Sequence, residues 1–221
     1  MNQNPGVIGK KLGSTQVYLP NGDLVAVSVI EAGPNVVVGH RTVEKDGYSA
    51  LVLGFGKRKA QRTTKPQAGQ FKKVGVEPMQ HVREFRMSPE LVATFPVGQP
   101  VKLDQIFTEG QIIDVQGKTR GRGFQGVVRR WSFAGFVQTH GTHEYRRHGG
   151  SIGTNMTPGR TLPNIKMPGH YGDETLTVLN QRLIKVDVEK NLLLVEGGVP
   201  GARNSIVAVR GAVKKKNAGK K

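Results

Sequence analysis

Residues 114–170 read DVQGKTRGRGFQGVVRRWSFAGFVQTHGTHEYRRHGGSIGTNMTPGRTLPNIKMPGH and separate two β-rich parts of the chain. Gly and Pro recur throughout, and apolar residues come singly or in pairs, without the sustained period of a strand or a helix. Such a segment buries too little apolar surface to offset the entropy lost when it is ordered. It is therefore either disordered or ordered by a partner outside the chain.

The charged side chains of this segment are almost all cationic, because Glu144 is the only acid after Asp114. Dense positive charge, a flexible backbone and scattered aromatic side chains together favour RNA as the partner. The cations are Lys118, Arg120, Arg122, Arg129, Arg130, Arg146, Arg147, Arg160 and Lys166, and the aromatic residues are Phe124, Trp131, Phe133, Phe136 and Tyr145.

The composition of the whole chain also indicates a polyanionic partner. The 221 residues carry a net charge of +17 and a sequence pI near 10.4. A membrane-surface protein would need an apolar anchor or a basic amphipathic helix, and the sequence has neither, nor an apolar run of about 18 residues. It has no signal-peptide core and no cysteine for disulfides or thiolate metal sites. We therefore predict a soluble, cytosolic protein with no membrane partner.

Residues 7–55 carry strand and turn signals. Residues 20–22 (PNG) predict a tight hairpin, because Asn-Gly supplies the positive φ that such a turn needs. Residues 23–31 alternate between apolar and polar side chains, and residues 36–38 and 48–55 are further apolar runs. Short strands at this spacing favour a barrel or a sandwich.

Residues 56–81 form a basic insertion in which only Glu77 opposes the cations. The segment is either a solvated surface loop, as charge runs usually are, or a second strip that contacts RNA. Both interpretations stay open. The cations are Lys57, Arg58, Lys59, Arg62, Lys65, Lys72 and Lys73.

Regular structure resumes after residue 170. In residues 183–189 a predicted strand places Ile184, Val186 and Val188 on one face, and residues 192–195 (LLLV) predict a core strand. Residues 205–209 predict the last strand, before a basic tail over residues 212–221. The simplest architecture is mainly β: a barrel formed by residues 1–115 and 171–211, interrupted by an irregular basic extension over residues 116–170.

Two short patterns match cofactor or catalytic motifs but lack the context that these motifs need. The GxGxxG of residues 121–126 matches a dinucleotide fingerprint, yet no βαβ alternation surrounds it and arginines flank its glycines. The GxSxG of residues 149–153 matches a nucleophile elbow, yet a polar segment precedes it and Pro158 disfavours the helix that should follow. We predict no cofactor, no small-molecule substrate and no catalytic residue.

His140, His143 and His148 raise the question of zinc, but neighbouring arginines would repel a cation and Glu144 is the only nearby carboxylate. Histidines that stack on bases or bond phosphates explain the same residues without that conflict, so we predict no metal. Trp131, which lies between two arginines and a phenylalanine, is as well explained by stacking or wedging against bases as by a place in a core.

The segments KTRGRGFQGVVRRWSF, HGTHEYRRHGGSIG and KMPGHYG closely resemble the central extension of the universal family of large-subunit ribosomal protein three, in its bacterial form. KPQAGQFKKVGVEP and VEKNLLLVEGGVPGARNSIVAVR resemble the same family outside the extension. The resemblance implies a six-stranded barrel of the kind shared with translation factors, and a loop that reaches through rRNA towards the peptidyl-transferase centre. It also implies early subunit assembly, rRNA and neighbouring ribosomal proteins as partners, and no enzymatic activity.

By that resemblance the tip of the loop is the turn over residues 150–158. Ser151, Gly153, Asn155 and Thr157 stand at positions that match the family. The sequence departs at Met156, where several bacterial relatives carry a glutamine that is N-methylated in some of them. Methionine has no side-chain amide, so that methylation is excluded here.

We therefore predict a structural, rRNA-binding protein of the large ribosomal subunit that neutralises phosphate charge with arginine and lysine. The cations of both basic segments, with Trp131, His140, His143 and His148, are the predicted rRNA contacts. A free-standing RNA-binding module or chaperone would explain the same charge and flexibility. An RNA-processing enzyme would need a catalytic set that the sequence does not supply.

Overall fold

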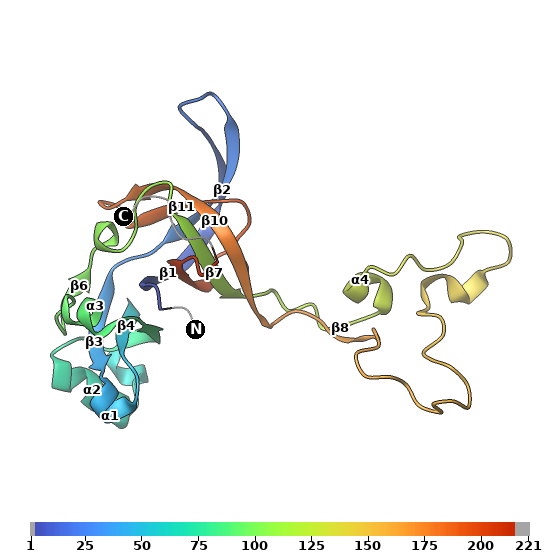
Figure 1. The fold of residues 1–221 in the computed structure, drawn as a ribbon, viewed down its shortest axis with the longest axis horizontal. Coiled ribbons are helices and arrows are strands. Elements are labelled where there is room, and N and C mark those ends of the chain that lie inside the picture. The colour runs from blue at the N-terminus through green and yellow to red at the C-terminus, as the bar shows by residue number, and fades with distance from the viewer. Residues whose placement is uncertain (1–2, 215–221) are drawn as a thin grey trace. The chain divides into compact units, whose positions relative to one another are not determined.

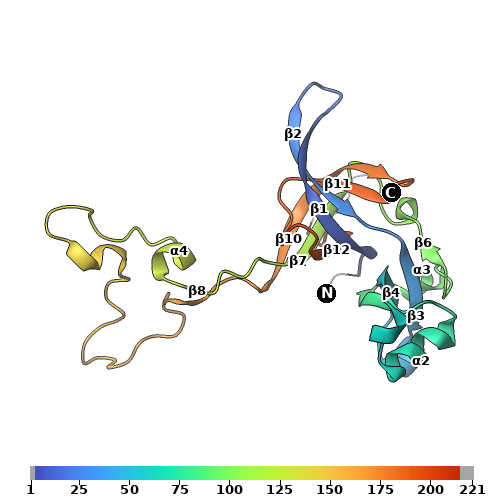
Figure 2. The same ribbon diagram turned by 180° about the vertical axis from the view of Figure 1, so that it is seen from behind.

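The computed structural model describes residues 3–214, and the chain forms two compact units. The barrel unit contains the chain up to Lys118 and from Thr175 onward, and the basic unit contains Thr119–Glu174 (Figures 1 and 2). Residues 116–118, placed in the extension from sequence, continue a barrel strand. Of the predicted basic tail, residues 215–221 lie outside the described residues.

Six strands close into an antiparallel barrel in the order β1-β12-β7-β10-β11-β2. The prediction of a mainly β fold with a barrel is confirmed. The predicted hairpin joins the first two strands: Gly22 has φ 86°, and the Leu19 N–H donates to the Asp23 carbonyl at 2.9 Å. The barrel strands are β1 (Gly6–Tyr18), β2 (Leu24–Glu31), β7 (Ile112–Lys118), β10 (Thr175–Asp187), β11 (Leu192–Glu196) and β12 (Ile206–Gly211).

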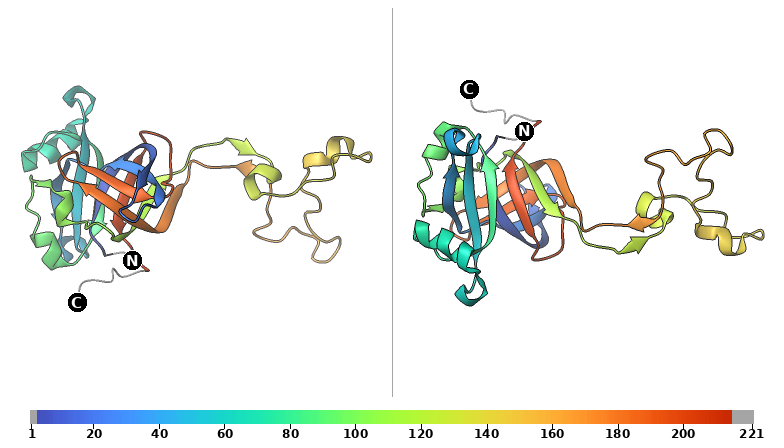
Figure 3. Two further views of the ribbon diagram at one scale, coloured as in Figure 1. Left: turned by 90° about the horizontal axis from the view of Figure 1, so that it is seen from above. Right: turned by 90° about the horizontal axis from the view of Figure 1, so that it is seen from below.

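A second, four-stranded sheet has the order β5-β4-β3-β6, so the prediction of a barrel alone was incomplete (Figure 3). Its side chains join the same hydrophobic core as those of the barrel, and Gly6 of β1 leaves room for the ring of Phe85. The sheet contains β3 (Asn35–Arg41), β4 (Ala50–Lys57), β5 (Met79–Arg86) and β6 (Pro100–Val101), accompanied by α1 (Val43–Asp46), α3 (Pro89–Ala93) and η2 (Leu103–Gln105).

The basic insertion is not the loop that one interpretation predicted. It contains η1 (Ala60–Arg62) and α2 (Lys65–Val74), and its last residues begin β5. Proline in the first turn and Gly75, left-handed at φ 73°, delimit α2 as such residues commonly do. Phe71 is its buried side chain. The burial of the Phe71 ring therefore holds α2 against the rest of the unit, while its other side chains are mostly exposed.

The strand predictions after residue 170 hold for β11 but not for the face of β10. Leu193 and Val195 of β11 are fully buried, as the LLLV run predicted. In β10 the register shifts between Leu183 and Lys185. Leu183 is buried and Val186 packs against the core, so the inward-facing side chains are not the alternating set that was predicted. Val188, on the predicted apolar face, lies beyond the end of β10 and is 40% exposed.

Buried polar side chains tie the barrel strands to their neighbours. The Asn35 amide accepts a hydrogen bond from the Ile8 N–H at 3.2 Å, and donates to the carbonyls of Ile8 and Ala32 at 2.9 and 2.7 Å. The Asp114 carboxylate accepts from the N–H groups of Asn180 at 2.9 Å and Val213 at 3.1 Å. Because a buried polar group is costly unless it is bonded, these contacts specify how the strands meet.

The basic unit has little regular structure. It contains a two-stranded ladder of β8 (Phe124–Gln125) with β9 (Gly169–His170), the short helix α4 (Val127–Trp131) and η3 (His143–Arg147) (Figure 1). Among the described residues of the whole chain, no helix is both long and apolar enough to cross a membrane.

Candidate nucleic-acid interface

The two ends of the basic unit run side by side as a narrow ribbon. The Thr119 N–H donates to the Glu174 carbonyl at 2.9 Å. The Arg122 N–H donates to the Tyr171 carbonyl at 2.9 Å, and the Arg122 guanidinium lies 5.0 Å from the centroid of the Tyr171 ring. Backbone hydrogen bonds thus hold the two sides of this ribbon together.

A single carbonyl organises the part of the unit around α4. The Met167 carbonyl accepts hydrogen bonds from Arg130 Nη1 at 2.9 Å and from Trp131 Nε1 at 2.8 Å. The Arg130 guanidinium lies 4.9 Å and the Lys166 ammonium 5.9 Å from the Trp131 ring centroid. The structure therefore gathers three of the predicted rRNA contacts into one cluster, in which donors of Arg130 and Trp131 bond within the chain.

A second local cluster joins η3 to the segment that precedes it. The Phe136 and Tyr145 rings lie 4.4 Å apart and the Tyr145 and His148 rings 4.5 Å apart, by their centroids. The Phe136 N–H also donates to the Arg146 carbonyl at 2.9 Å. Beside it Gly135 has φ 76°, and a Cβ there would meet that carbonyl at 2.5 Å, so glycine is required.

The predicted tip is an exposed turn shaped by its own polar side chains. The Ser151 hydroxyl donates to the Gly153 carbonyl at 2.9 Å, and Thr154 Oγ1 donates to the Thr157 carbonyl at 2.9 Å. Met156 is 86% exposed. Gly159, at φ 65°, needs its glycine. Gly153, which matches the family motif, has neither a positive φ nor a close intrachain neighbour, so nothing within the chain requires a glycine there.

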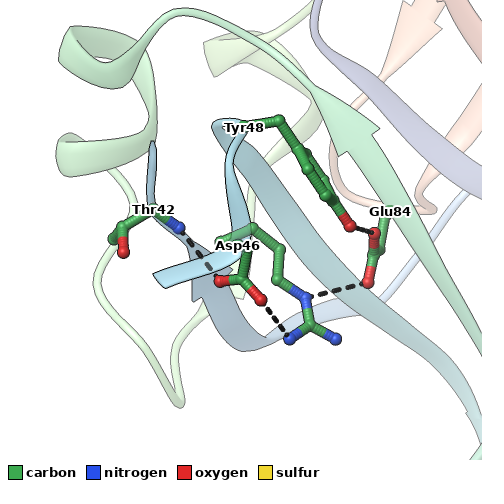
Figure 4. Close-up of polar contacts among 5 residues, drawn as sticks. Thr42, Asp46, Tyr48 and Glu84 are labelled. Carbon is green, nitrogen blue, oxygen red and sulfur yellow. Dashed lines mark hydrogen bonds and ion pairs between the residues drawn. The ribbon is translucent and has the colours of Figure 1, made fainter. Parts of the chain in front are cut away.

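The cations of the basic unit differ from those of the second sheet in their partners. In that sheet the Arg41 guanidinium is 3.0 Å from both Asp46 and Glu84, and the Tyr48 hydroxyl donates to Glu84 at 2.7 Å (Figure 4). The hydrogen bond from Tyr48, followed by that from Arg41, lowers the pKa of Glu84. This network was not predicted from the sequence, since its residues are ordinary in type and Glu84 is distant in sequence from Arg41, Asp46 and Tyr48.

None of the seven arginines of the basic unit has a carboxylate partner among the described residues. Arg130 is half-buried and the other six are exposed, namely Arg120, Arg122, Arg129, Arg146, Arg147 and Arg160. In the basic insertion, Lys57 lies 2.9 Å from Glu77, and both side chains are mostly exposed. An unpaired guanidinium can bind a phosphate through paired N–H donors without first giving up a carboxylate.

The GxGxxG and GxSxG segments stand in structural surroundings that differ from those of the cofactor and catalytic motifs they match. Gly126 precedes a helix of five residues, and the strand before it has two residues, so the GxGxxG segment is no βαβ turn. The Ser151 hydroxyl donates to a carbonyl of its own turn, and residues 152–214 contain no helix. Among the described residues, no group of three or more His, Cys, Asp or Glu side chains is arranged to hold a metal ion.

Comparison with known proteins assigns the chain to the ribosomal proteins. Residues 92–191 match the family model described as Ribosomal protein L3. A protein named large ribosomal subunit protein uL3 from Sorangium cellulosum is 60% identical over 98% of this chain and 93% of its own length. Proteins of the same name from Myxococcus xanthus and Thermotoga maritima are 50% and 48% identical over 95% and 93% of this chain, and 93% and 96% of their own lengths.

The chain belongs to the uL3 family of large ribosomal subunit proteins. It is a structural, non-enzymatic constituent of the large subunit, as the family is. These comparisons confirm the family that the sequence motifs indicated. The individual rRNA contacts stay predictions.

Proposed function

We propose that this chain binds large-subunit rRNA through its basic unit and its basic insertion, and that it acts in the cytoplasm from an early stage of subunit assembly. The turn over residues 150–158 extends towards the peptidyl-transferase centre. Neighbouring ribosomal proteins are the other partners. The barrel unit is the stably folded part of the protein, and the basic unit provides the positive charge and the irregular surface that contact the RNA.

The observation that carries this proposal is the set of exposed arginines without carboxylate partners in a unit with almost no apolar core. Arg129, Arg146, Arg147 and Arg160 present their donors to solvent among the described residues. A duplex or a folded RNA releases counterions when such groups take its phosphates, so binding gains free energy that the unit cannot obtain by burial.

The test compares the whole chain with a variant in which Thr119–Glu174 is replaced by a short Gly/Ser linker. The linker can close because Lys118 and Thr175 lie opposite each other in the barrel. We expect the barrel to unfold cooperatively as before. Affinity for large-subunit rRNA should fall, and the slope of log K against log salt should flatten by roughly 0.7–0.9 for each phosphate that the variant no longer binds.

Sedimentation of cell lysate separates this role from that of a free-standing RNA chaperone. A ribosomal constituent travels with the large subunit on a sucrose gradient and stays with it after a salt wash. A chaperone would spread over many RNAs and remain near the top. An unchanged salt slope in the linker variant would overturn the assignment of the basic unit as the main RNA-binding part.

A further inference from the structure

The basic unit contains a pocket that its overall charge does not explain. The pocket has a volume of about 360 Å³, and its apolar lining includes Val127, Phe133, Ile152, Ile165 and Met167. Val127 is buried, with 5% of its surface exposed. Pockets that hold small organic groups in proteins span about 300–1,000 Å³, so this one is large enough for a planar ring.

Cationic side chains and glycine backbone also line the pocket. Arg147, His148 and Lys166 line it together with Gly149 and Gly150, and none of its described lining residues is acidic. The two glycines expose backbone without a side chain in the way. An apolar interior beside cations suits a nucleotide, whose base is planar and whose phosphates are anionic.

Contacts within the chain build this pocket in advance of any ligand. Met167 is one of the lining residues, and hydrogen bonds from Arg130 and Trp131 fix its backbone carbonyl. On another side, a Cβ on Gly149 would stand 3.4 Å from the methyl groups of Val127, so the backbone packs closely there. A site whose parts are already held in place loses less entropy when it binds.

We propose that this pocket holds one unstacked base of the large-subunit rRNA. The base inserts between Phe133 and Ile152, and Arg147 and Lys166 bind the phosphates on either side of it. This inference rests on the proposed rRNA-binding function and deepens it. The cationic side chains in the lining, with no carboxylate among the described lining residues, favour a nucleotide over a protein side chain as the occupant.

The test uses large subunits purified from cells that carry only Ile152→Trp, with Leu162→Trp as the matched control. Ile152 lines the pocket and is 57% exposed, while Leu162 is 55% exposed and does not line it. Dimethyl sulfate and carbodiimide report base accessibility. We expect one unpaired base to become about tenfold more reactive in Ile152→Trp subunits, given the strength of base stacking on protein, and no change in the control.

A photoreactive p-benzoylphenylalanine placed at position 152 gives a second measurement, which does not depend on filling the pocket. A cross-link to one nucleotide supports the proposal. A cross-link to protein alone, or unchanged base reactivities in Ile152→Trp subunits with normal protein content, overturns it and leaves rRNA binding intact. If the unaltered chain is absent from large subunits or makes no RNA contact in them, the proposed function fails as well.

Discussion

The barrel unit and the basic unit are stabilised in different ways. The barrel unit has a continuous core that includes Ile8, Leu53, Phe85 and Leu193, all fully buried. In the described basic unit, Val127 is the only buried apolar side chain. The basic unit relies on backbone ladders and on side chains that bond to carbonyls, which are worth about 0.5–1.5 kcal/mol each. The same chain thus combines a part that orders itself with a part whose order depends more on its surroundings.

The largest expected contrast comes from truncating one apolar side chain in each unit. Leu193→Ala removes a fully buried side chain from the core and should lower the free energy of unfolding by about 2–5 kcal/mol. Val127→Ala should leave the barrel transition unchanged, because Val127 is not part of that core. Urea denaturation of the full chain, followed by circular dichroism, measures both. Equal losses of stability in the two variants would mean that the units share one cooperative core.

A smaller loss in the free energy of unfolding is expected when the buried side-chain amide of Asn35 is removed. Asn35→Ala leaves the Ile8 N–H and the carbonyls of Ile8 and Ala32 without their partner. Each unsatisfied buried group costs about 1–3 kcal/mol, so we expect a loss of about 2–3 kcal/mol if some groups find other partners. Asn155→Ala at the exposed tip is the control and should stay within about 0.5 kcal/mol. The same denaturation assay checks both variants.

The features predictable from sequence are those that depend on neighbours in the chain. The Asn21-Gly22 turn and the LLLV strand follow from local backbone preference and apolar runs, and both are confirmed. Pro66 and Gly75 are residues typical of the two ends of a helix, and they stand at the ends of α2. The helix was not predicted, because the dense charge of the insertion favoured a surface loop or an RNA-contacting strip. The division of the strands between the barrel and a second sheet was not predictable, because it depends on pairings between residues distant in sequence, such as Asn35 with Val101.

Two further features depend on partners that the sequence does not identify. The irregularity after Leu183 arises where β10 pairs with β11 and changes which side chains face the core. The Met167 carbonyl is a backbone group, so no residue type signals that it will hold Arg130 and Trp131. The candidate interface was therefore predictable by its charge, and its internal geometry was not.

The third prediction separates arginines of the two units by their salt dependence. Arg129→Gln should flatten the slope of log K against log salt for rRNA binding by about 0.7–0.9, as expected when one phosphate is no longer bound. Arg41→Gln should leave the slope unchanged, because Arg41 already pairs with Asp46 and Glu84. Filter binding at several salt concentrations measures the slopes. Equal slopes for Arg129→Gln and the unaltered chain would place Arg129 in solvent.

A comparison of Arg130→Gln with Arg129→Gln tests what the hydrogen bond to Met167 contributes to local order. Arg130 donates to the Met167 carbonyl, so its substitution should loosen the pocket as well as remove charge. The backbone amide hydrogens of Lys166, Met167 and Gly169 should then exchange faster than in Arg129→Gln. Equal exchange in the two variants would mean that the hydrogen bond to Met167 contributes nothing to local order.

The smallest expected effect concerns the pH dependence of the second sheet. The Tyr48 hydroxyl bonds to Glu84 and is the main cause of the lowered pKa of that carboxyl. A carboxyl whose pKa is lower in the folded state stabilises the fold above its unfolded pKa of about 4.3. That stabilisation disappears as the pH falls through the lowered value. In Tyr48→Phe the pKa of Glu84 should therefore rise towards its ordinary value, and acid unfolding of the barrel unit should become less steep.

The measurement for Tyr48→Phe is a carbon-detected NMR titration of the Glu84 carboxyl, with Tyr145→Phe as the control from the basic unit. Tyr145 belongs to the basic unit and packs there against Phe136 and His148, so removing its hydroxyl should leave the titration unchanged. The effect should be modest, because both Glu84 and Arg41 keep part of their side chains in solvent, which screens the interaction. A Glu84 pKa that stays low in Tyr48→Phe would assign the shift to Arg41 instead. Arg41→Gln, which removes the other hydrogen-bond donor, would then raise it alone.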